Sequence, residues 1–155
     1  MQDEVQEQER EEARLRLQDV VTQRTELEQR VMALRAQLLQ HSSILREAYN
    51  RQERDWIPYR VARQALVQAE QENSHNLNEF VQAQEAALQV YNASSNAYTI
   101  LNTQRLDLEL NIRLLDQSIY ALSREEYRLN VTIYGQGQGQ GRRRKRNTRK
   151  KRGRN

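Results

Sequence analysis

The residues with the clearest chemistry lie at the C-terminal end, where thirteen positions carry ten positive charges and no carboxylate. These charged residues are Arg142, Arg143, Arg144, Lys145, Arg146, Arg149, Lys150, Lys151, Arg152 and Arg154. Guanidinium groups bind phosphate through paired N–H donors and stack on unpaired bases. No aromatic residue interrupts the run, so it predicts a salt-sensitive contact with phosphates rather than a reading of base sequence.

The basic run has three possible roles, which are nucleic-acid binding, nuclear import and binding to a membrane surface. Nucleic acid is the first, and an Arg-rich unstructured segment slightly favours RNA over duplex DNA. A nuclear-import signal is the second, because it needs only one or two Lys/Arg clusters of this kind. An anionic membrane surface is the third and weakest, since the run offers no apolar side chain for insertion.

Charge is strongly segregated along the chain. The whole chain has a net charge of +4 and the run contributes ten positive charges, which leaves −6 for residues 1–141. Residues 135–141 have glycine at every second position and predict a flexible spacer, followed by a disordered tail at 142–155. Thr148 lies inside the run, where a phosphate would offset part of its charge.

Residues suited to catalysis or metal binding do not form a recognisable motif. Cysteine is absent, and His41 and His75 belong to no cluster with ligand spacing. We therefore expect no enzyme activity, metal or cofactor. His41, Arg24, Arg105 and Glu126 instead fall at predicted core positions of a helix, where a polar residue fixes register.

The elements that carry the tail are predicted to be long helices. Glycine is absent before residue 135, proline occurs once, and apolar residues follow a seven-residue repeat. The expected fold is all-α, a coiled-coil region over 1–134 with helices over about 3–55 and 59–133. The predicted oligomer seam comprises Leu27, Leu34, Leu38, Leu101, Leu108, Ile112, Leu115, Ile119, Leu122 and Leu129.

Pro58 predicts the boundary between the two helices, with the break at 56–58. A kinked but continuous helix is the alternative. Residues 73–78 and 92–96 are poor helix formers and predict local breaks, and within the first of them Asn76 resembles a restart cap. Apolar residues also alternate at 106–112 and 129–133, so a β-strand is the alternative to helix in these two stretches.

A chain that folds back at Pro58 predicts a helical hairpin whose first helix covers the second only to about residue 111. Residues 115–133 would then have to pair with another copy, so a hairpin that oligomerises is preferred over a kinked rod of parallel chains. At the tip, Trp56, Ile57 and Tyr59 would either pack against the helices or form a docking site.

In plan, a helical assembly region followed by an Arg-rich tail resembles small viral core or virion-associated proteins that package genomes. The sequence thus favours a self-assembling coiled-coil protein that binds nucleic acid through its tail. The alternative is a scaffold that pairs with a foreign coiled-coil partner and uses the tail for nuclear import. No secretory signal is evident, so a nuclear, cytoplasmic or virion location is expected.

Overall fold

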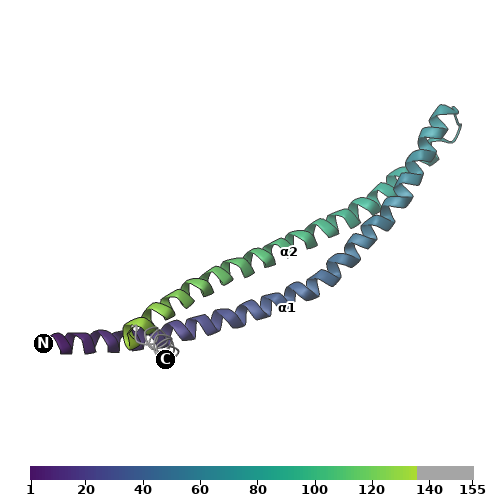
Figure 1. The fold of residues 1–155 in the computed structure, drawn as a ribbon. Coiled ribbons are helices and arrows are strands. Elements are labelled where there is room, and N and C mark those ends of the chain that lie inside the picture. Colours follow the sequence, from purple (N-terminus) through teal and green to yellow (C-terminus); the bar gives the residue numbers. More distant parts are fainter. Residues whose placement is uncertain (136–155) are drawn as a thin grey trace, which may run out of the picture. The chain divides into compact units, whose positions relative to one another are not determined.

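The computed structural model describes residues 1–135, which form two long helices and the short turn between them (Figure 1). Helix α1 spans Gln2–Gln71 and helix α2 spans Leu77–Tyr134. These residues contain no strand, which confirms the all-α prediction and assigns the alternating stretches at 106–112 and 129–133 to α2. Residues 136–141 of the predicted spacer and the predicted tail at 142–155 lie outside the described residues.

The least exposed residues of each helix recur at alternating steps of three and four. This spacing places them on one side of each helix, as the heptad repeat predicted. The seam residues are half-buried throughout: Leu27, Leu34, Leu38, Leu101, Leu108, Ile112, Leu115, Ile119, Leu122 and Leu129. Full burial is confined to a few positions such as Val20, because a two-helix seam has solvent on both sides.

The helices form two compact units, each a pair of helical segments. One unit contains Met1–Met32 of α1 and the part of α2 from Arg113 onward, and the other contains Ala33–Ile112 with the turn. In the second unit Tyr49 contacts Tyr98 and Trp56 contacts Tyr91, so the segments run antiparallel. The helical hairpin is therefore confirmed.

The predicted helix boundary at 56–58 is wrong, because α1 continues through Pro58 without interruption. The less exposed positions Asp55, Tyr59 and Ala62 keep their spacing on both sides of the proline. Pro58 itself is exposed, so water can reach the backbone carbonyl that loses its partner. Continuous packing along the seam thus outweighs the local cost of proline.

The chain reverses instead at Glu72–Asn76. Asn73 adopts a left-handed conformation with φ of 49° and donates its N–H to Glu70 O at 3.4 Å. Ser74 N–H donates to Ala69 O at 3.0 Å, so the two bonds form a Schellman motif that ends α1. Asn76 O then accepts from Glu79 N–H at 3.0 Å, which confirms Asn76 as the residue where helix restarts.

The position of the turn also corrects the predicted overhang. Residues 115–133 were expected to lack a partner within their own chain. In the unit that contains them, Glu125 and Glu126 bind Arg16 and Arg24 of α1, and Ile133 is only 6% exposed. The unpaired segment lies at the other end of the chain: every residue from Met1 to Glu12 is exposed, and the first turns of α1 extend past the end of α2 (Figure 1).

Candidate functional site

The ten predicted nucleic-acid-binding residues, Arg142 to Arg154, lie outside the described residues. The structure does describe the end of the helix that precedes them. Gly135 has φ of 69° and its N–H donates to Val131 O at 2.8 Å, which closes α2 directly after Tyr134. A left-handed residue at this position is the usual end of a helix and favours glycine. The first glycine of the predicted spacer is therefore the point where the chain leaves the helix.

Two charged residues predicted to fix register meet across the seam. Arg24 Nη1 lies 2.7 Å from Glu126 Oε2, and the side chains are 29% and 23% exposed. Among the described residues neither Arg24 Nε nor Glu126 Oε2 finds a hydrogen bond of good geometry, so the attraction between them is mainly Coulombic. A register shift would leave each charge against apolar side chains, which opposes other alignments.

A second ion pair lies nearer the free end of the same unit. Arg16 Nε donates to Glu125 Oε1 at 2.8 Å, and Arg16 Nη1 donates to Asp19 Oδ2 at 2.9 Å. The hydrogen bond to Glu125, followed by the charge of that carboxylate, raises the pKa of Arg16 above its ordinary value. Arg16 is half exposed, so this ion pair contributes little to the free energy of folding and mainly favours one alignment of α1 with α2.

The other two polar seam residues bind in different ways. The His41 Nε2 atom lies 2.6 Å from Leu101 O, a contact between α1 and α2. Arg105 stays on its own helix, where it donates to Asn102 Oδ1 and to Glu109 Oε1. The interpretation of His41 as a seam residue therefore agrees with its contact, whereas Arg105 makes no ion pair across the seam among the described contacts.

Trp56 and Tyr59 do not lie at the tip of the hairpin, since the turn is at 72–76. Their rings pack with Tyr91 of α2: Trp56 lies 5.2 Å from Tyr91 between ring centroids, and Tyr59 stacks on Tyr91 at 6.1 Å. Packing, rather than docking, is the alternative that these contacts favour. Ile57, beside Pro58, is 53% exposed and Trp56 is 38% exposed, so part of this cluster still faces solvent.

The structure shows one surface that the sequence analysis did not consider, a stripe of Tyr120, Arg124, Tyr127 and Tyr134 on α2 that also includes the half-buried Val131. The tyrosines are 66%, 72% and 70% exposed. Members of this Tyr–Arg stripe stand two residues from seam residues such as Leu122 and Leu129, and a step of two turns a helix by about 200°. The stripe therefore lies opposite the seam. Its own spacing of three and four residues was the available signal in the sequence.

The described residues contain no group of His, Cys, Asp or Glu side chains that could hold a metal ion. No helix in residues 1–135 is long and apolar enough to cross a membrane. No protein family, curated protein or solved structure matches this chain. The assignment of function therefore depends on its own residues and contacts.

Proposed function

We propose that this protein is a non-enzymatic, self-assembling helical protein that binds nucleic acid electrostatically through Arg142–Arg154. The observation that carries the proposal is the density of charge: ten Arg or Lys residues in thirteen positions with no carboxylate. A segment of this kind neutralises phosphates and releases their counterions, and this release supplies most of the free energy of sequence-independent binding. A structural role in a nucleoprotein particle follows from this chemistry.

The helical region supports the proposal through its opposite charge. Residues 1–141 carry a net charge of −6, so a polyanion is repelled by the helices and attracted to the tail. Gly135 ends α2 and so separates the tail from the helical region. Several copies in one assembly would present several tails to one nucleic acid and raise the apparent affinity by orders of magnitude.

The fold affects self-assembly and the foreign-partner alternative alike. The seam that would recruit another chain is the face on which α1 and α2 already contact each other within the two units. A partner, whether a second copy or a foreign coiled coil, would need a different surface or would have to separate the helices. Nuclear import through the same tail is compatible with nucleic-acid binding and can be tested separately.

The test is a salt titration of binding, with fluorescence anisotropy of a labelled single-stranded RNA and a duplex DNA. Protein purified at high salt should bind both, and the slope of log K against log salt should correspond to about six to ten phosphates. The full chain with its ten tail Arg and Lys residues changed to Gln should lose binding and most of the slope.

The matched control is Arg60→Gln with Arg63→Gln, two exposed positions on α1 within the second unit. This variant should bind like the original protein. Equal affinity of the tail-neutralised chain and the original chain would refute the tail as the binding element. Nuclear accumulation that depends on the tail, without any nucleic-acid binding, would support the import alternative instead.

A further inference from the structure

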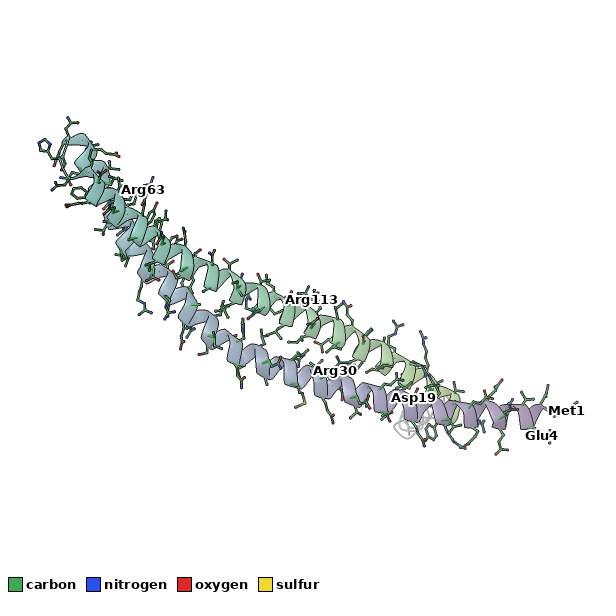
Figure 2. The ribbon with its side chains drawn as sticks, turned by 180° about the vertical axis from the view of Figure 1, so that it is seen from behind. Met1, Glu4, Asp19, Arg30, Arg63 and Arg113 are labelled. Carbon is green, nitrogen blue, oxygen red and sulfur yellow. The ribbon has the colours of Figure 1, made fainter. Side chains whose placement is uncertain are left out.

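The first turns of α1 are a helix without a tertiary partner among the described residues. All of Met1–Glu12 is exposed, and Figure 2 shows Met1 and Glu4 at the free end, beyond the end of α2. This segment carries six carboxylates and a single basic side chain, that of Arg10. A helical segment of this length gains little stability unless an apolar or charged face is packed. Met1–Glu12 is called the acidic overhang below.

The Tyr–Arg stripe has the complementary character. Tyr120, Tyr127 and Tyr134 present large exposed rings, and Arg124 lies over the Tyr120 ring with its guanidinium carbon 5.9 Å from the centroid. Arg128 adds a further exposed positive charge next to the stripe. Arg113 precedes Tyr120 by one heptad, and Figure 2 shows it on the side of α2 away from α1.

The two surfaces agree in length and spacing. The acidic overhang is about 17 Å long and the stripe from Tyr120 to Tyr134 about 21 Å, at 1.5 Å per residue. Glu4, Glu7 and Glu11 are spaced by three and four residues, so they share a face of the overhang. Arg124 and Arg128 stand one turn apart on the other surface. Side chains with this periodicity on both partners suit helix-to-helix packing.

We infer that the Tyr–Arg stripe of one copy binds the acidic overhang of a second copy, an inference that rests on the self-assembly part of the proposed function. The overhang cannot reach the stripe of its own chain, because it continues α1 as one unbroken helix and the stripe faces away from α1. Tyrosine rings contact Met1 and Val5 of the partner, while Arg124 and Arg128 face its carboxylates.

This contact has a consequence for the tail. The stripe ends at Tyr134, one residue before Gly135 closes α2. Docking of a second copy at this place gathers the starting points of the tails of both copies at one end of their helices. Two tails that begin close together bind one nucleic acid with an increased effective concentration.

A charge-exchange experiment on the full chain tests the inference. We would measure self-association by sedimentation velocity at about 0.15 M salt, with nucleic acid removed at high salt beforehand. Arg124→Glu with Arg128→Glu should weaken association by about tenfold or more, and Glu4→Arg with Glu7→Arg should do the same. The chain that carries all four substitutions should associate again, because each new charge meets an opposite one.

Arg60→Glu with Arg63→Glu serves as the matched control, since it reverses two exposed charges away from both surfaces. Circular dichroism should show unchanged helix content in every variant. If the double reversal unfolds the protein, the milder change Arg124→Gln with Arg128→Gln replaces it and should also weaken self-association.

Three outcomes would overturn the inference. The original protein could stay monomeric, the charge reversals could leave self-association unchanged, or the chain with all four substitutions could fail to regain self-association. Loss of RNA affinity in the Arg124/Arg128 variant alone, at concentrations where the protein is monomeric, would assign the stripe to nucleic acid instead. Failure of the proposed nucleic-acid function is a separate result, because RNA binding can be absent while charge exchange still restores association.

Discussion

Arg24 and Glu126 occupy seam positions that would otherwise hold apolar residues, and they pair across the seam, while Arg24 Nε also lies 3.7 Å from Glu28 Oε1 on the same helix. Their separation of 2.7 Å and their partial burial make the pair more than a surface contact. A partly buried pair contributes little net stability compared with well-packed apolar residues, but removal of one partner leaves a charge facing the seam. The pair therefore selects an alignment of α1 with α2 in this unit more than it strengthens the fold.

We predict that Glu126→Arg destabilises the protein by about 1–3 kcal/mol, because two guanidinium groups then face each other in the seam. Arg24→Glu in the same chain should restore most of that loss. Urea unfolding followed by circular dichroism measures both changes. As a control, Asp19→Arg disturbs the exposed pair of Asp19 with Arg16 on the same helix and should cost less than about 1 kcal/mol. A double variant no more stable than the sum of its single changes would show that the pair is not coupled.

Among the elements, α1 shows how packing overrides a local signal. Pro58 lies inside a helix of 70 residues. Trp56 and Tyr59, on either side of it, contact each other at 5.4 Å between ring centroids and both pack with Tyr91 of α2. These aromatic contacts hold the helix on both sides of the proline, so the chain keeps its helical path although one backbone hydrogen bond is lost.

Pro58→Ala should therefore stabilise the protein by about 1–3 kcal/mol, since it restores a backbone donor at an exposed helical position without changing the seam. The midpoint of urea unfolding reports the gain. The matched control is Val61→Ala, a change at a nearby exposed position of the same helix that should shift the midpoint by much less. A lower midpoint for Pro58→Ala would mean that the proline contributes to the native conformation.

For the whole molecule, the main feature is the separation of charge between an acidic helical region and a cationic tail. The proposed function uses both parts: the helices determine how many tails act together, and the tails bind the polyanion. Thr148 lies among the tail charges, where a carboxylate or phosphate would oppose binding. A negative charge at Thr148 should therefore lower the affinity for nucleic acid and leave folding unchanged.

We predict that Thr148→Glu lowers RNA affinity by about two- to tenfold at moderate salt and reduces the slope of log K against log salt by about one. Thr148→Gln, which adds similar bulk without charge, should bind almost like the original protein. Anisotropy titrations at several salt concentrations measure both. Identical slopes for the Glu and Gln variants would exclude Thr148 as an electrostatic switch.

The sequence alone determined the helical class and which face of each helix is the less exposed one. Leu27, Leu101 and Ile119 lie on the less exposed face of their helices, because the heptad repeat depends only on the period of the helix and on which residues are apolar. Their assignment to a seam between copies stays a prediction. The absence of glycine before residue 135 and the single proline left few other folds. The charge of the tail likewise follows from composition, so its predicted chemistry needs no tertiary information.

The tertiary structure decided where the chain turns and which surfaces remain free. Local preferences at Pro58, at Asn73 and at residues 92–96 all signalled a break, but α1 continues through Pro58 and α2 continues through 92–96. Only the packing of the helices within each unit determines which break is used. Once the turn lies at Glu72–Asn76, residues 115–133 gain α1 as a partner and Met1–Glu12 loses one. The Tyr–Arg stripe has a visible period in the sequence. Its exposure depends on which face of α2 meets α1, and that is a property of the folded pair.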